Sequence, residues 1–270
     1  MPEHIIWVTV WMNRLLGKPA AALLAALHIH PDNPQYPIPT YVCMQIMVFL
    51  LCGIFFLWLR TRMSVEDPGA AQQMMEGLLE NPMGIGARDL LQENIAHDAD
   101  RYLPMVGSLG IYILVANLIS IVPSLDSPTA EKSVPLGCAI VVFLYYNFQG
   151  VRHHGAPKYG KHFLGPILPM SPIMLPVEIF SHSFRLLSLT ARLWANMFVS
   201  ELLYGVFLGL TVGIFVFLGK LSGIGYISAV LPLAIPPIFI LLHVFVAFVQ
   251  AFVFTILPVI YLSGAVGEEH

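Results

Sequence analysis

The chain has 270 residues, of which 13 are Lys or Arg and 16 are Asp or Glu. This charged fraction of 11% is less than half of the roughly 25% found in soluble domains, whereas hydrophobic residues make up 57% of the chain and the mean hydropathy is +0.76. So few charges cannot cover so much apolar surface in water, and a net charge of -3 offers no basic patch for a polyanion. The composition excludes a soluble enzyme, a disordered chain and a nucleic-acid binder, and it predicts an integral membrane protein.

The first 40 residues differ from the rest of the chain. Ile5–Leu16 is apolar but too short for a membrane span, which takes about 20 residues, and Glu3 precedes it where a signal peptide has basic residues. We expect a helix in the membrane interface, followed by a proline-rich connector over residues 31–39. The predicted division is an N-terminal segment outside the membrane (1–40) and a membrane domain (41–270).

Three apolar runs predict transmembrane helices roughly perpendicular to the membrane. They cover Tyr41–Leu59, Leu103–Val122 and Val134–Phe148. Residues 64–102, between the first two spans, are rich in Asp and Glu, and the apolar residues of 71–79 recur at helical spacing. This intervening segment predicts an amphipathic helix on the membrane surface, followed by a polar loop.

Two basic clusters predict the orientation of the chain. Arg60 and Arg62 follow the first span, and Arg152, Lys158 and Lys161 follow the third. Loops rich in Lys and Arg stay in the cytoplasm, so both clusters place the same side of the membrane there. The N-terminus is expected outside, and the polar C-terminus is expected in the cytoplasm.

Two apolar segments near the C-terminus are too long for simple spans. Val177–Gly219 has no proline, and as one helix it would be about 65 Å long at 1.5 Å per residue, whereas the hydrocarbon layer is about 30 Å thick. Ile227–Leu262 poses the same problem, and a short Gly/Ser turn at Leu221–Tyr226 joins the two. The predicted fold is an all-α integral membrane protein with three roughly perpendicular spans, a surface amphipathic helix and a long tilted C-terminal helical hairpin.

A polar stripe runs along one face of the first long segment. At 100° per residue, the polar residues within about 40° of Arg192 are Glu178, Ser181, Arg185, Ser188 and Asn196. Glu201 lies near the opposite face. Burying a charge in a membrane costs a few kcal/mol or more, and arginine stays protonated, so Arg192 holds a fixed positive charge and does not pass protons on. An ion pair that only joins helices is an alternative, but such an arginine is more typical of an ion path.

The last segment carries polar groups that match the stripe. His243 and Gln250 are seven residues apart and lie on one face of the predicted helix. Tyr261, eleven residues after Gln250, lies on the same face. Histidine titrates near neutral pH, so His243 is a candidate proton carrier together with Glu201 of the neighbouring helix; a structural core histidine is the alternative. The three cysteines lie in apolar runs without a disulfide or metal-ligand context. No metal, no cofactor and no catalytic residue is therefore predicted.

These motifs resemble subunit a of the rotary F-type ATP synthase, the membrane stator that conducts protons to the rotating c-ring. Residues 188–197 read SLTARLWANM and are followed by Glu201-Leu202, close to the family pattern S-L-x-x-R-L-x-x-N-M with E-L four residues later. His243, Gln250 and Tyr261 also fit, and the resemblance runs from about residue 40 to the C-terminus. Two departures are Trp194-Ala195, where the family often has Phe-Gly, and Ser200, where it often has Gly.

The resemblance implies a role for each matching residue. Arg192 matches the stator arginine that faces the c-ring carboxylate. The half-channel open to the outside is matched by Asn196, Glu201, His243 and Gln250. The half-channel open to the cytoplasm is matched by Glu178 and Ser181.

The implied setting is the inner (plasma) membrane of a bacterium. The implied partners are the c-ring subunits, the peripheral-stalk b subunits, the other synthase subunits and membrane lipid. The chain would carry no catalytic chemistry of its own, but it would belong to the proton-transporting ATPase.

Two other function classes are alternatives to this one. A secondary transporter or ion channel with an intramembrane Arg/Glu gate would need its own binding site, and usually duplicated halves; neither is visible in the sequence. An intramembrane enzyme would need a nucleophile–base pair or a metal cluster, and the sequence contains no H-E-x-x-H or G-x-S-x-G motif.

Overall fold

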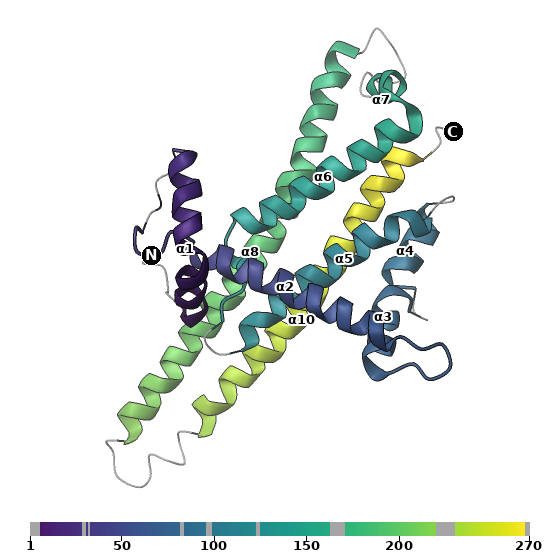
Figure 1. Ribbon diagram of the computed structural model, residues 1–270. Coiled ribbons are helices and arrows are strands. Elements are labelled where there is room, and N and C mark those ends of the chain that lie inside the picture. Colours follow the sequence, from purple (N-terminus) through teal and green to yellow (C-terminus); the bar gives the residue numbers. More distant parts are fainter. Residues whose placement is uncertain are drawn as a thin grey trace. The chain divides into compact units, whose positions relative to one another are not determined.

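The computed structural model of the chain is helical, and its described residues contain no strand (Figure 1). The structure describes residues 6–28, 31, 33–81, 84–95, 99–122, 125–162, 171–219 and 230–267.

Five helices within the described residues are long and apolar enough to cross a membrane. They are α2 (Thr40–Arg62), α5 (Ala99–Leu118) with the short helix η1 (Ile119–Ile121), α6 (Ser133–His154), α8 (Ser171–Gly219) and α10 (Val230–Val266). The prediction of an all-α integral membrane protein is therefore confirmed. The orientation of the spans in the membrane stays a prediction, and the expected turn at Leu221–Tyr226 falls outside the described residues.

Helix α8 is the longest element of the chain (Figure 1). Its 49 residues correspond to about 73 Å of helix, so a perpendicular α8 could not fit a hydrocarbon layer of about 30 Å. The helix starts six residues before the expected Val177 and continues through Pro176, which lies in its second turn. A proline there removes one backbone hydrogen bond close to the helix end, which costs less than in the interior.

The described residues fall into two compact units. The first unit comprises Met1–Phe55, Val115–Glu131 and Ala195–Ala247, and the second comprises Phe56–Leu114, Lys132–Trp194 and Phe248–His270.

Helix α1 (Trp7–Ala26) opens the first unit and is longer than the helix expected over Ile5–Leu16. The Asn13 side chain joins it to the connector before α2, since its Nδ2 donates to Ile38 O at 2.9 Å and its Oδ1 accepts from Ile38 N at 2.9 Å. Thr9 Oγ1 adds a buried hydrogen bond to Thr40 Oγ1 at 3.1 Å. These contacts fix the start of α1 against the start of α2.

The acidic segment in the second unit forms two helices instead of one. Helix α3 (Ala70–Leu79) forms within the segment where a helix was predicted, and its place on the membrane surface stays a prediction. Helix α4 (Ala87–Asn94) stands where a polar loop was expected. Asp89 explains the difference, because its Oδ2 accepts from the backbone of Gly86, at 3.3 Å, and of Asn81, at 2.7 Å, and so caps the start of α4.

An exposed ion-pair network joins α4 to its neighbours. Arg88 lies 3.0 Å from both Glu80 and Asp100. Hydrogen bonds to Asp100, which has the larger effect, and to Glu80 raise the pKa of the Arg88 guanidinium. Because all three side chains are exposed, the network contributes little to stability.

The basic segment after α6 contains a short helix that the sequence did not predict, α7 (Ala156–His162). Gly155, with φ of +81°, makes the turn between the two helices. Tyr159 of α7 then packs against Gly150 and donates a hydrogen bond to Asn147 Oδ1 at 3.0 Å. Burial raises the pKa of the Tyr159 hydroxyl.

The close approach of α6 and α7 predicts the effect of a side chain at Gly150. A Cβ atom there would contact the Tyr159 ring directly, so Gly150→Leu should displace α7 and destabilise the protein by about 1–3 kcal/mol, as overpacking does. Gly137→Leu on the same helix is the matched control, because nothing lies within 4 Å of a Cβ at that position. Thermal unfolding in detergent measures both variants, and equal melting temperatures would contradict the packing described.

Candidate functional site

Seven polar residues of the first unit form a hydrogen-bonded group around His243, which we term the His243 cluster. Helix α8 supplies Ser200 and Glu201, α10 supplies His243, and the segment from the end of α5 to α6 supplies the rest. The members are Asn117, Ser120, Ser127, Thr129, Ser200, Glu201 and His243.

The imidazole of His243 is buried, with 6% of the residue exposed. Its Nε2 lies 3.0 Å from the carbonyl oxygen of Asn117 and 3.0 Å from Ser120 Oγ. A carbonyl oxygen can only accept a hydrogen bond, so we assign the ring hydrogen to Nε2. Ser120 Oγ fits this assignment, because its own hydrogen is donated to Asn117 O at 3.1 Å.

The second ring nitrogen, Nδ1, lies 2.7 Å from Ser200 Oγ. A hydroxyl group can donate or accept. When the imidazole is neutral, the Ser200 hydroxyl donates to Nδ1; when the ring is protonated, Nδ1–H donates to the same oxygen. The site therefore satisfies both charge states of His243 by rotation of one hydroxyl hydrogen.

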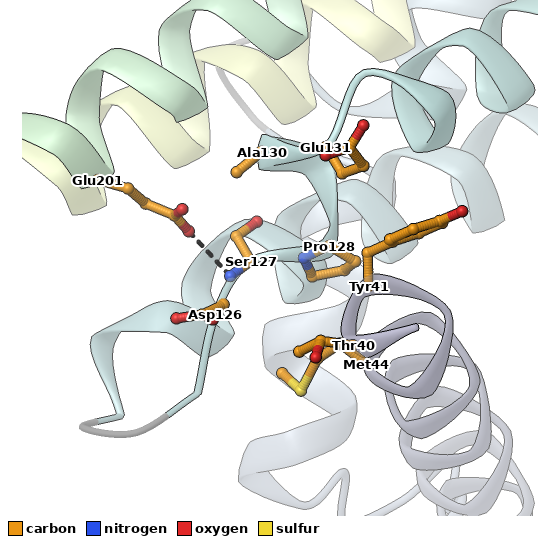
Figure 2. Close-up of a pocket in the computed structure, with 9 residues that line it drawn as sticks. All are labelled: Thr40, Tyr41, Met44, Asp126, Ser127, Pro128, Ala130, Glu131 and Glu201. Carbon is orange, nitrogen blue, oxygen red and sulfur yellow. Dashed lines mark hydrogen bonds between the residues drawn. The ribbon is translucent and has the colours of Figure 1, made fainter. Parts of the chain in front are cut away.

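Glu201 lies at the edge of a pocket of about 200 Å³ in the same unit, and Figure 2 shows its carboxylate turned toward Ser127. Its Oε1 accepts a hydrogen bond from Ser127 N at 2.8 Å. The remaining pocket wall consists of Thr40, Tyr41, Met44, Asp126, Pro128, Ala130 and Glu131. With two exposed carboxylates, Asp126 and Glu131, the pocket has room and polar partners for several water molecules.

The loop beside Glu201 connects it to His243. Ser127 Oγ donates to Ala116 O at 2.8 Å and lies 2.6 Å from Thr129 Oγ1, which donates to Asn117 Oδ1 at 2.6 Å. Two hydroxyl hydrogens thus serve three oxygen–oxygen contacts, so the hydrogen-bond pattern of this loop can exist in more than one arrangement. Asn117 Nδ2 is buried and has no partner among the described residues.

Glu201 and His243, which the sequence placed together, are brought into one cluster but not into direct contact. Within the described residues they are joined through the Ser127–Thr129–Asn117 loop. No role was predicted from the sequence for Asn117, Ser127, Thr129 or Ser120. Polar side chains at the end of the second predicted span were the signal that could have identified them.

Arg192 lies on an exposed face of α8. Asn196, one turn further along the helix, is exposed as well. The residue that follows each of them, Leu193 and Met197, is fully buried. The predicted polar stripe therefore begins half-buried at Glu178 and Ser181 and ends exposed at Arg192 and Asn196. An arginine in an apolar helix requires a counter-charge or water.

Gln250 is buried in the second unit, with 2% of the residue exposed, and its Oε1 has no partner among the described residues. Tyr261, on the same helix, lies beneath the Arg185 guanidinium, 5.2 Å from the ring centroid. Arg185 thus makes a cation–π contact within the unit.

A second polar group lies around Glu178, which we term the His182 cluster: Tyr146, Glu178 and His182. Glu178 Oε1 lies 3.3 Å from His182 Nε2, and His182 Nδ1 lies 2.7 Å from the Tyr146 hydroxyl. Glu178 was predicted from the sequence, whereas His182 was not. Its position four residues after Glu178, on the same helical face, was the signal.

Among the residues that the structure describes, no group of three or more His, Cys, Asp or Glu side chains could hold a metal ion. What the two clusters offer instead is titratable side chains with hydroxyl partners. This chemistry is suited to moving protons between side chains rather than to breaking covalent bonds.

Comparison with known proteins shows the family. The family model described as the ATP synthase A chain matches residues 41–263. The chain belongs to the ATP synthase subunit a family. Its members are the proton-translocating membrane-sector subunit of F-type ATP synthase, so the chain is a multi-pass membrane protein that works with the other synthase subunits.

Three relatives show how far the similarity extends. ATP synthase subunit a of Koribacter versatilis is 36% identical over 99% of both chains. The subunit of Solibacter usitatus is 40% identical over 96% of this chain and 99% of its own, and that of Geotalea uraniireducens is 33% identical over 92% and 94%. The resemblance drawn from the motifs is confirmed, and the transporter and enzyme alternatives are set aside.

The contact between Ser200 and His243 predicts the effect of removing the hydroxyl. Ser200→Ala leaves the protonated imidazole without its Nδ1 partner, and loss of a hydrogen bond to a buried charge costs about 1.5–3 kcal/mol. Proton conduction through membrane vesicles stripped of the catalytic sector should fall about tenfold or more. Ser200→Thr keeps the hydroxyl and is the control. Equal conduction by the alanine and threonine variants would remove the role assigned to Ser200.

Proposed function

We propose that the His243 cluster forms the proton path between the outside and the c-ring, termed the outer path. Glu178 and Ser181 belong to a second path toward the cytoplasm, termed the inner path. Arg192 lies between them and faces the c-ring carboxylate. The single observation that carries this proposal is the buried His243, whose two ring nitrogens have partners in both charge states of the imidazole.

Two separate paths are required by the energetics of the gradient. Moving one charge across the membrane is worth about 2.3 kcal/mol for each 100 mV. A continuous proton path would dissipate this energy as leakage. If the two paths are joined only by rotation of the ring, each proton that crosses must move the ring.

The outer path begins, in this proposal, at the pocket beside Glu201. Asp126 and Glu131 give the pocket a negative charge that attracts protons. Glu201 accepts a proton from pocket water. The segment that holds Glu201 through Ser127 N and His243 through Asn117 O positions both groups, and water carries the proton between them. Gln250 and Asn196, both uncharged, are proposed as further residues of the outer path.

Arg192 acts as a fixed charge rather than as a carrier. Its guanidinium stays protonated, so it repels a proton that would pass directly between the two paths. The same positive charge favours ionisation of an approaching carboxylate, which then releases its proton to the inner path. The exposed position of Arg192 on α8 supports a partner on another subunit.

We propose the inner (plasma) membrane of a bacterium as the location, with the N-terminus outside and the C-terminus in the cytoplasm. In this orientation the start of α2 and the segment 125–132, which line the pocket, face the outside, as the outer path requires. The c-ring and the peripheral-stalk b subunits are the proposed direct partners. Reporter fusions at the two termini test the orientation, and activity of both reporters on one side would contradict it.

Replacement of the fixed charge tests the proposal. Arg192→Ala should abolish ATP synthesis driven by a proton gradient while the complex still assembles, because nothing then separates the two paths. Arg192→Lys should rescue poorly, since lysine is readily neutralised when it loses water.

Ser188→Ala is the matched control for Arg192→Ala, because Ser188 is exposed on the same helical face. It should retain near-normal ATP synthesis. The measurement is ATP synthesis by membrane vesicles, normalised to assembled complex. Normal synthesis by Arg192→Ala would refute the role of the arginine.

A further inference from the structure

We propose that His182 is a proton-carrying residue of the inner path and that the Tyr146 hydroxyl is its exchange partner. This inference rests on the function proposed above, in which Glu178 belongs to that path. It adds two residues that neither the sequence motifs nor the comparisons assign.

The His182 side chain is buried between α6 and α8, both of which belong to the second unit at this point. Only 10% of its surface is exposed, against 33% for Glu178. Its Nε2 lies 3.3 Å from Glu178 Oε1. An ionised carboxylate can only accept, so with Glu178 ionised the hydrogen of the neutral ring is placed on Nε2.

The other ring nitrogen lies against an amphoteric group. Tyr146 Oη is 2.7 Å from His182 Nδ1, and a phenol hydroxyl can donate to the neutral ring or accept from the protonated one. This is the arrangement found at His243, where an acceptor-only oxygen contacts Nε2 and a hydroxyl contacts Nδ1. Two buried histidines of one chain thus have partners that allow both charge states.

The geometry allows a balanced transfer. A proton that arrives at Nδ1 through the Tyr146 hydroxyl makes the ring cationic, and the Nε2 proton then passes to the Glu178 carboxylate. One proton enters the ring and one leaves it, so the imidazole ends neutral and the carboxyl ends protonated. Glu178, which is the more exposed of the pair, then releases its proton to water.

Aromatic contacts hold the imidazole in this orientation. The Tyr146 ring stacks on it with centroids 5.8 Å apart and planes 24° apart, and Phe143 meets it edge-on at 6.4 Å. A fixed ring plane keeps Nε2 directed to α8 and Nδ1 directed to α6. A single transfer therefore needs no rotation of the ring. It leaves the ring hydrogen on Nδ1, and this hydrogen must return to Nε2 before the ring carries the next proton.

Three further residues lie close to the cluster. Tyr261 of α10 packs on Tyr146 at 5.9 Å, Arg185 of α8 lies over Tyr261, and Tyr159 of α7 reaches Asn147 beside Tyr146. The charged groups of this surrounding are the Glu178 carboxylate, 3.3 Å from His182 Nε2, and the Arg185 guanidinium over the Tyr261 ring.

Proton conduction through the membrane sector tests the inference. Vesicles carrying the complex are stripped of the catalytic sector, and the rate is measured against the pH on the cytoplasmic side. His182→Gln keeps hydrogen bonding but cannot carry a proton, so conduction should fall about tenfold or more. The change in rate near neutral pH that a titrating imidazole produces should disappear.

Two further variants separate proton transfer from packing. Tyr146→Phe keeps the stacked ring and removes only the hydroxyl, and it should also lower the rate several-fold. Phe180→Leu removes an aromatic contact of α8, to Phe184, that does not involve His182, and it should keep the normal dependence on pH. A purely structural His182 would change the amount of assembled complex but not the pH dependence of the rate per complex.

Glu201→Gln in the same vesicles serves as the reference for the proposed function. If it blocks conduction while His182→Gln and Tyr146→Phe conduct at the normal rate and with the normal pH profile, the inference on His182 is wrong and the two-path proposal stands. If Glu201→Gln also conducts normally, the proposed function itself fails. Loss of rate and of pH dependence in His182→Gln supports the inference.

Discussion

A side chain that carries protons inside a membrane must keep a hydrogen-bond partner in each of its charge states, because a buried polar group without one costs several kcal/mol. His243 meets this requirement with a carbonyl oxygen on Nε2 and the Ser200 hydroxyl on Nδ1. Three elements of the fold supply the ring and these two partners. The last turn of α5 brings the Asn117 carbonyl, α8 brings the hydroxyl, and α10 brings the ring. Of the oxygens around the ring, only a hydroxyl can reverse its role when the proton arrives or leaves.

The length of α8 fits the two-path proposal. Glu178 and Glu201 are separated by about 35 Å of helix rise, more than the thickness of the hydrocarbon layer. One continuous element can therefore supply a carboxylate to each proposed path and hold Arg192 between them. A helix of ordinary span length could not do so. The length that makes a perpendicular orientation impossible is, in this account, what lets one helix serve both paths.

The sequence predicts those features that are costly in a membrane and fails on those that depend on the backbone. Arg192, Glu201 and His243 could be identified because a charged or titratable residue in an apolar segment needs a reason. The contacts of Ser127 N and Asn117 O could not, since any residue carries these groups and only the fold directs them. Helix α4 was not predicted because its start depends on the capping contacts of Asp89. The polar composition of this segment fits a loop as well as a capped helix.

The central claim is that Glu201 and His243 serve one proton path, and an exchange of the two residues tests it most directly. Proton conduction by stripped membrane vesicles is measured for Glu201→Gln, for His243→Ala and for the double variant Glu201→His/His243→Glu. The account predicts that each single variant loses most of its conduction and that the double variant regains part of it, because a carboxylate and an imidazole are again joined through the Ser127–Thr129–Asn117 loop. Normal conduction by either single variant would contradict the account.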